Sequence, residues 1–248
     1  MLKIIISCLL LFFVQPVFAT DYSEVDARAK NTPVEKEQRL ETLVRYLIEP
    51  YRSNDELKAR AIFAWIAYHV EYDNFKYDVI TENKKGLRYK NRRLDTGDAF
   101  KTRIGVCGDI ANLFQRMAKI ARLESEEIRG YAGYNLTMNN FKEAGHAWNA
   151  VKIKGKWFFV DATWGMGGDY LTNENVDSFV QHRRDIRERK QQKSFKVNEN
   201  RYLQNEWFLV EPKKMIETHF PRQAKHQHLK QSIDMKKVFR KNARKMEK

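Results

Sequence analysis

Three residues of this chain carry the functional groups of a nucleophilic triad, in the order Cys107, His146 and Asp161. In such a triad a thiol attacks a carbonyl carbon, an imidazole moves the proton, and a carboxylate holds the imidazole in its working tautomer. The three lie in the segments Gly105-Val106-Cys107-Gly108-Asp109, Gly145-His146-Ala147-Trp148-Asn149 and Val160-Asp161-Ala162-Thr163-Trp164-Gly165. We take them as the predicted catalytic residues.

Cys107 has two possible roles, a reactive nucleophile or a structural cysteine without chemistry. The other cysteine, Cys8, lies in an N-terminal apolar run that follows Lys3 and precedes the small-residue site Val17-Phe18-Ala19. This pattern predicts a signal peptide over residues 1–19, and the run is shorter than the about 20 apolar residues of a membrane span. We therefore expect a secreted or periplasmic protein without a transmembrane segment. Its single mature thiol is either reactive or a buried, inert side chain, and the count alone leaves both open.

The elements around the triad are predicted to bring it together. Apolar residues recur at helical spacing from Ile110 to Ala121, which places Cys107 at a helix N-terminus, where free N–H groups stabilise a thiolate. Residues 146–153 and 156–162 read as two strands joined by a Lys154-Gly155 turn. With a two-residue turn, Val151 opposes Phe158 and His146 lies diagonal to Asp161 on one face.

Upstream, two helices are expected. Thr32-Pro33-Val34-Glu35 is typical of a helix start, and its apolar face continues through Leu47 until Pro50. Ser53 is predicted to cap a second, very apolar helix, and residues 70–72 to turn into an extended piece. Downstream, residues 207–210 have strand character, and 212–219 suggest a short helix.

The three catalytic segments resemble those of the transglutaminase-like superfamily, in particular its branch of kyphoscoliosis peptidases and cytokinesis proteins. Segments 62–73, 208–212 and 219–221 add to the resemblance, which covers roughly residues 53–221. It implies an α+β, papain-like fold, with the nucleophile on a helix N-terminus packed against a small antiparallel sheet. It also implies Cys107 as nucleophile, His146 as general base and acid, and Asp161 as the orienting carboxylate. Taken singly, His146 is typical of a core histidine and Asp161 of a turn carboxylate.

The bounds of the signal-like segment and of the family resemblance predict the domain organisation. We expect a signal peptide at 1–19, an N-terminal helical extension at 20–52, a catalytic domain at 53–221 and a basic C-terminal tail at 222–248. The backbone N–H of Cys107 is the predicted first donor to an oxyanion. The candidates for the second donor are Trp65, His69 and Tyr72, because their helix ends near the expected cleft.

The net charge of +14 is concentrated in the last quarter of the chain, where residues 181–248 hold twenty Lys and Arg against eight Asp and Glu. Such a surface attracts an anionic envelope surface or an acidic protein, or it serves solubility alone. No nucleic-acid module is visible. The histidines have no zinc-binding spacing, and no EF-hand or glycine-rich phosphate loop is present, so we expect no metal and no cofactor.

The sequence thus predicts an exported cysteine enzyme that acts on a protein or peptide substrate, at peptide or side-chain amides, through a thioester at Cys107. Hydrolysis is favoured over acyl transfer, because nothing marks a site for an amine donor. The alternative is a catalytically silent protein of the same fold that binds an acidic partner through its basic C-terminal region.

Overall fold

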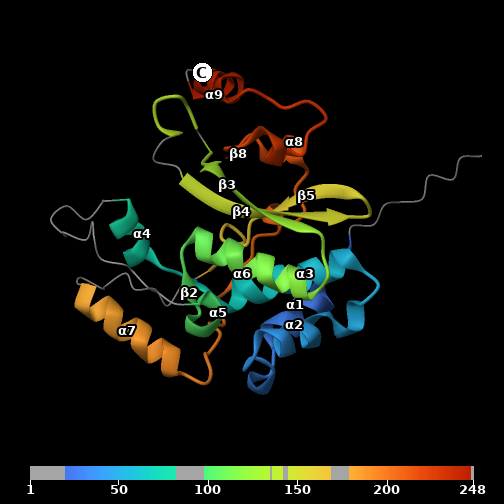
Figure 1. Ribbon diagram of the computed structural model, residues 1–248, viewed down its shortest axis with the longest axis vertical. Helices are drawn as coiled ribbons and strands as arrows, with labels where there is room; N and C mark the ends of the chain where they lie inside the picture. Colours follow the sequence, from blue (N-terminus) through green and yellow to red (C-terminus); the bar gives the residue numbers. More distant parts are fainter. Residues whose placement is uncertain (1–19, 82–97, 135, 142–144, 169–178, 247–248) are drawn as a thin grey trace, which may run out of the picture.

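The computed structural model describes residues 20–81, 98–134, 136–141, 145–168 and 179–246 (Figure 1). The expected signal peptide at 1–19 lies outside these residues. Within the described part of the chain, no helix is both long enough and apolar enough to cross a membrane.

Three helices form the first part of the fold: α1 (Ser23–Lys30), α2 (Leu40–Ile48) and α3 (Asp55–His69). The apolar face of α2 is buried as expected, and α3 is buried on nearly every side. Both predicted caps are wrong in detail. The hydroxyl of Thr32 donates to Ala29 at the end of α1 (2.9 Å), and a 3₁₀ turn (Val34–Lys36) precedes α2. Asn54, not Ser53, caps α3, because its side chain accepts the N–H of Leu57.

The segment that leads to the nucleophile is short and tightly paired. Strand β1 (Glu71–Tyr72) runs parallel to β2 (Ile104–Gly105), with Tyr72 opposite Gly105. Between them lie α4 (Asn74–Ile80) and α5 (Ala99–Thr102), the latter capped by Asp98. Helix α6 (Cys107–Ile120) then begins at Cys107, as the sequence predicts, and buries an amphipathic face.

The central sheet is antiparallel and has the strand order β5-β4-β3-β8. Its strands are β3 (Ser125–Ala132), β4 (Gly145–Ile153), β5 (Lys156–Val160) and β8 (His219–Pro221). The predicted hairpin register is confirmed, since Val151 pairs with Phe158 across the Lys154-Gly155 turn. Both turn residues have positive φ, 49° and 79°, as a two-residue hairpin with the right-handed twist of its strands requires.

The two faces of the sheet pack against different partners. Val151, Ile153 and Val160 join the main core with α3 and α6, which lie on one side of the sheet in Figure 1. The other face belongs to a second cluster: Ile128, Trp148, Ala150, Phe159, Trp207, Val210 and Met215. By strand alternation, His146 lies on the Trp148 face, and Asp161 continues the Phe159 face.

The C-terminal third differs most from expectation. The expected strand at 207–210 is reduced to an isolated bridge of Val210 to Phe159, and Trp207 ends a 3₁₀ helix (Asn205–Trp207). Helix α8 (Pro212–Met215) is shorter than predicted, because His219 already belongs to β8. The other elements of the described residues are a 3₁₀ helix after α2 (Glu49–Tyr51), β6 (Met166–Gly167), β7 (Tyr202–Leu203), α7 (Phe179–Gln191), a 3₁₀ helix at Ala224–Gln227 and α9 (Met235–Met246). Helix α9 packs Val238 and Phe239 against Ile216 and Phe220.

Candidate active site

The nucleophile is held at the first turn of α6. Val106 is extended, and the Asp109 carboxylate folds back to accept its N–H at 3.1 Å. Gly105 makes this possible, because a Cβ there would lie 2.8 Å from the Cβ of Asp109. A Cβ on Gly108 would meet nothing within 4 Å, so the space beside Cys107 is open to an incoming group.

The side chains of Cys107 and His146 lie close enough for each to shift the pKa of the other. The Nε2 atom of His146 lies 2.6 Å from Oδ2 of Asp161, which leaves Nδ1 for the sulfur. The structure thus brings the three predicted residues into one chain of contacts, although 39 and 15 positions separate them in the sequence.

Asp161 sits in a turn that fixes its carboxylate. It is fully buried, and its Oδ1 accepts the backbone N–H groups of Thr163 (2.8 Å) and Trp164 (3.0 Å). Its own N–H donates to Trp207 O at 3.0 Å, so the 3₁₀ segment anchors the end of β5. Gly165 closes the turn against Phe63, where a Cβ would come within 2.3 Å of the ring.

The charges of the triad reinforce one another. Burial by itself would lower the pKa of His146, but the Asp161 carboxylate and the Cys107 sulfur raise it to about 10. Burial would raise the pKa of the Cys107 thiol, yet the hydrogen bond and charge of His146, with the N–H of Ala147, bring it below its usual value. The pKa of Asp161 is well below its ordinary range despite burial, because two imidazoles donate to it. These shifts favour a thiolate–imidazolium pair beside an ionised carboxylate over a neutral thiol and imidazole.

Two of the three candidates for the second oxyanion donor are wrong. The Trp65 indole N–H donates to Glu37 at 2.9 Å, and Nε2 of His69 contacts Ala29 O at 3.0 Å, so both belong to a separate buried cluster. Burial and the neighbouring Arg103 charge lower the pKa of His69 to about 3, so this ring is neutral.

Tyr72, by contrast, lies at the nucleophile. The β1–β2 pairing sets it opposite Gly105, and its hydroxyl lies near the backbone N–H of Cys107. Burial first, and the Cys107 charge second, raise the pKa of Tyr72 far above its usual value, so the hydroxyl keeps its proton. A neutral hydroxyl at this position can donate to an oxyanion that forms on a bound carbonyl.

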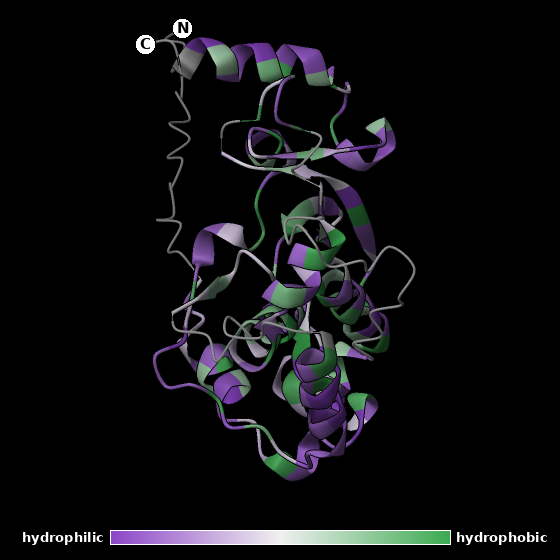
Figure 2. Ribbon diagram, turned by 90° about the vertical axis from the view of Figure 1, so that its left-hand side faces the viewer, coloured by the Kyte–Doolittle hydropathy of each residue, from purple (hydrophilic) through white to green (hydrophobic). Residues whose placement is uncertain are grey.

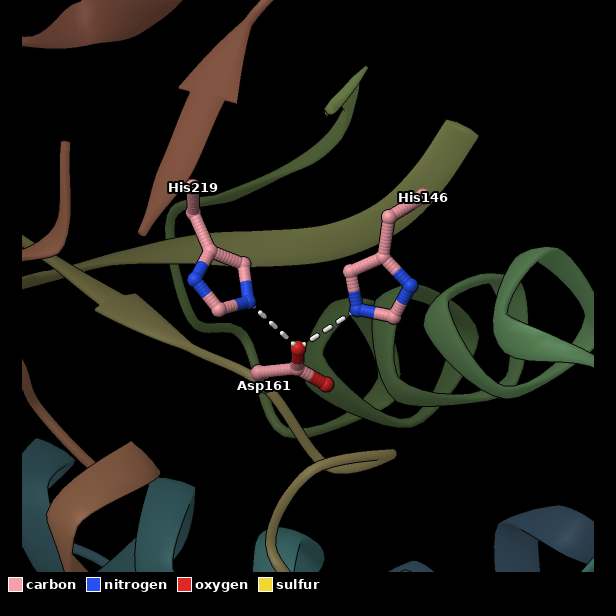
Figure 3. Close-up of side chains that lie close together, drawn as sticks. All are labelled: His146, Asp161 and His219. Atoms are coloured by element: carbon pink, nitrogen blue, oxygen red, sulfur yellow. Dashed lines mark hydrogen bonds and ion pairs between the residues drawn. The ribbon is translucent and has the colours of Figure 1, made fainter. Parts of the chain in front are cut away.

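His219 is a site residue that sequence reasoning did not identify. Its Nε2 lies 2.9 Å from Oδ2 of Asp161, the same oxygen that His146 contacts (Figure 3). The three side chains place their potential ligand atoms within 4.8 Å of one another. Both nitrogen–oxygen contacts have the length of charge-assisted hydrogen bonds, which accounts for the cluster without an ion. The sequence signal was its place in segment 219–221, which adds to the family resemblance, but nothing there points to a partner 58 positions away.

Aromatic rings enclose this end of the site. The Trp164 ring lies 4.5 Å from the His219 ring and 5.8 Å from the His146 ring, measured between centroids. Trp148 and Trp207 each lie 5.2 Å from the His219 ring. Trp148, Trp207 and the His219 ring are buried, so these rings pack around the inner end of the site.

The comparisons with known proteins agree with this geometry. Residues 41–162, which include all three triad residues, match the model of the transglutaminase-like superfamily. Mouse kyphoscoliosis peptidase is 30% identical over 214 residues, which are 84% of this chain and 27% of that protein. Hillarin from Drosophila melanogaster is 26% identical over 228 residues, 87% of this chain and 24% of that protein. The chain thus spans about a quarter of the length of these curated relatives.

Among solved structures, the periplasmic domain of TgpA from Pseudomonas aeruginosa is 16% identical, with a TM-score of 0.38, and the match covers 57% of this chain and 47% of that one. A likeness of that size does not bear on function. The predicted α+β fold is confirmed by the helices and the antiparallel central sheet. Residues 41–162 carry a domain of the transglutaminase-like superfamily, and the curated proteins that the chain resembles include kyphoscoliosis peptidase.

Proposed function

We propose that this protein is a cysteine enzyme that cleaves peptide or side-chain amides through a thioester at Cys107. The observation that supports it most is the 2.6 Å contact of His146 with Asp161 beside the Cys107 thiol, combined with a thiol whose pKa is lowered. A structural cysteine has no need of either feature.

The chemistry would proceed in two halves. The Cys107 thiolate attacks the amide carbon, a C–S bond forms, and the carbonyl oxygen becomes an oxyanion beside the Cys107 N–H. His146 gives its proton to the leaving amine as the C–N bond breaks, which leaves a thioester. His146 then takes a proton from water, whose oxygen attacks the thioester and releases the acid and the thiolate. Asp161 orients His146 throughout and stabilises its charged form.

The thiolate–imidazolium pair of Cys107 and His146 is tested by measuring the rate of alkylation of Cys107 with iodoacetamide as a function of pH. The wild-type thiol should react well below the pKa of about 8.5 of a free cysteine, and His146→Ala should slow alkylation about tenfold or more near pH 6. His228→Gln is the matched control, because His228 contacts Glu126 and lies outside the triad, and it should react like the wild type. A wild-type profile centred near pH 8.5 would contradict the proposal.

Catalysis itself is tested by intact-mass measurement after incubation with peptide amides. An acyl adduct on Cys107 that is absent from Cys107→Ser supports the thioester. Adding a primary amine then separates hydrolysis from acyl transfer, and we propose hydrolysis, which gives a free acid even when the amine is present.

We also propose that the protein works outside the cytoplasm. The support is the signal-like pattern of residues 1–19, and N-terminal sequencing of protein recovered from the cell exterior or periplasm should begin near Thr20. A cytoplasmic product that keeps residues 1–19 would refute export.

A further inference from the structure

His219 forms a second contact to the triad carboxylate from an element far from the first. It is fully buried at the start of β8, and its Nε2 approaches Oδ2 of Asp161 at 2.9 Å, opposite the 2.6 Å contact of His146 (Figure 3). In the close-up the two imidazoles converge on one carboxylate oxygen from two strands, β4 and β8.

The tautomer of His219 follows from its partners. An ionised carboxylate only accepts hydrogen bonds, so Nε2 must carry the proton that faces Asp161. The other nitrogen, Nδ1, lies 2.9 Å from the hydroxyl of Thr218. Burial first, and the nearby His146 charge, hold the pKa of His219 below its ordinary value, so the ring is neutral. The Thr218 hydroxyl has two possible acceptors for its single proton, Nδ1 of His219 at 2.9 Å and Met215 O at 3.2 Å, and a neutral ring protonated at Nε2 makes Nδ1 the acceptor. Asp161 and His146 are the titratable groups that act on this ring.

The carboxylate of Asp161 is thereby saturated. A carboxylate offers about four lone-pair sites. Two are taken by the backbone N–H groups of Thr163 and Trp164, one by His146 and one by His219. Only His146 among these donors changes its protonation during the proposed reaction. The other three hold the carboxylate in one orientation and favour its ionised form.

The surrounding packing excludes water from the contact between His219 and Asp161 and holds the two side chains together. Trp148, Trp164 and Trp207 surround the His219 ring. Strand β8 approaches β3 closely because residue 130 is glycine: a Cβ there would lie 2.2 Å from the Phe220 carbonyl oxygen and 2.6 Å from the Trp148 ring. A hydrogen bond in such an enclosed, water-poor site is electrostatically stronger than one in solvent.

We propose that His219 is a positioning residue, a neutral donor that holds Asp161 ionised and oriented toward His146 and so extends the triad to Cys107–His146–Asp161–His219. The inference rests on the proposed function, because it assigns a role within the same site. Its consequence is specific: without the His219 donor, Asp161 supports the His146 imidazolium less, and His146 in turn supports the Cys107 thiolate less.

The test compares His219→Leu, which keeps volume and removes the donor, with His219→Gln, whose amide N–H can reach Asp161. The readout is the pH midpoint of Cys107 alkylation, with thermal unfolding measured in parallel. The Leu variant should raise the midpoint by about one pH unit, and the Gln variant should restore most of the wild-type value. Turnover on an amide substrate should fall about tenfold or more in Leu and recover in Gln.

A merely structural role predicts a different pattern. Both variants would then unfold at lower temperature while the alkylation midpoint stayed at the wild-type value, and this outcome overturns the proposal. An ordinary thiol profile in the wild type overturns the proposed function instead, so the two failures are distinguishable.

A measurement on the wild type covers the case in which His219→Leu does not fold. Histidine ¹⁵N–¹H correlation spectra report the tautomer of each ring, and His219→Gln assigns the signal. A neutral ring protonated at Nε2 supports the proposal. A ring protonated at Nδ1, or a cationic ring at neutral pH, overturns it.

Discussion

Tyr72 is the residue whose role the structure sharpens most after the triad itself. Its hydroxyl lies near the Cys107 N–H, the predicted first oxyanion donor, and burial keeps it protonated. We therefore expect Tyr72→Phe to lower turnover about 10²- to 10³-fold, the usual cost of losing one oxyanion donor. Alkylation by iodoacetamide forms no oxyanion, so its pH midpoint should stay near that of the wild type.

Tyr77→Phe is the matched control, because it removes the hydroxyl of a neighbouring tyrosine whose ring centroid lies 6.0 Å from that of Tyr72. It should retain turnover. A Tyr72→Phe protein with unchanged turnover would show that Tyr72 supports α6 without donating to the oxyanion.

At the scale of elements, the β4–β5 hairpin sets the distance between His146 and Asp161. Each turn residue has positive φ, and a Cβ on Gly155 would meet nothing within 4 Å. A substitution there acts through backbone strain alone. Gly155→Val should lower the free energy of unfolding by about 1–2 kcal/mol, because a β-branched residue disfavours this conformation.

Urea unfolding measures this effect, and Lys154→Asn is the control, because asparagine tolerates positive φ at the other turn position. The control should be as stable as the wild type or slightly more so. Equal stabilities of Gly155→Val and the wild type would mean that the turn does not constrain the hairpin.

The register of the β4–β5 hairpin was predictable from the sequence. The ends of several helices and the strand expected at 207–210 were not. The Lys154-Gly155 pair between two apolar runs marks its own turn, so the register depends on a few adjacent residues. Residues 207–210 have aromatic and β-branched, strand-like composition, yet Trp207 ends a 3₁₀ helix and only Val210 forms a bridge. There Trp207 O accepts the Asp161 N–H and its ring packs beside His219. Tertiary packing overrides propensity at such positions.

At the scale of the whole molecule, positive charge collects on α9. Val238 and Phe239 face the core, while Lys236, Lys237, Arg240, Lys241 and Arg244 are exposed. Figure 2 shows this helix lying across one end of the molecule with hydrophilic residues along much of its length. We propose that this surface, together with the rest of the basic C-terminal region, attracts an anionic envelope surface.

The change to test is the triple variant Lys236→Glu, Lys237→Glu and Arg240→Glu, which leaves the Lys241–Glu217 ion pair intact. It should reduce retention on vesicles that contain anionic lipid, and added salt should weaken wild-type retention in the same way. The control reverses exposed charges on α7 at Arg184, Arg187 and Lys190. Equal loss in both variants would indicate an effect of net charge without a docking surface.

The order of the triad residues, the helix start at Cys107 and the hairpin turn were determined by the sequence itself, because each depends on residues close together in the chain. The family resemblance and the α+β class, both confirmed, rest on the same short segments. Only the tertiary structure decided that Tyr72 lies at the nucleophile while Trp65 and His69 bond elsewhere. It alone brought β8 beside β3, so that His219 reaches Asp161 from 58 residues away. Such contacts depend on the packing of whole elements, here on the close approach at Gly130, which no local pattern encodes.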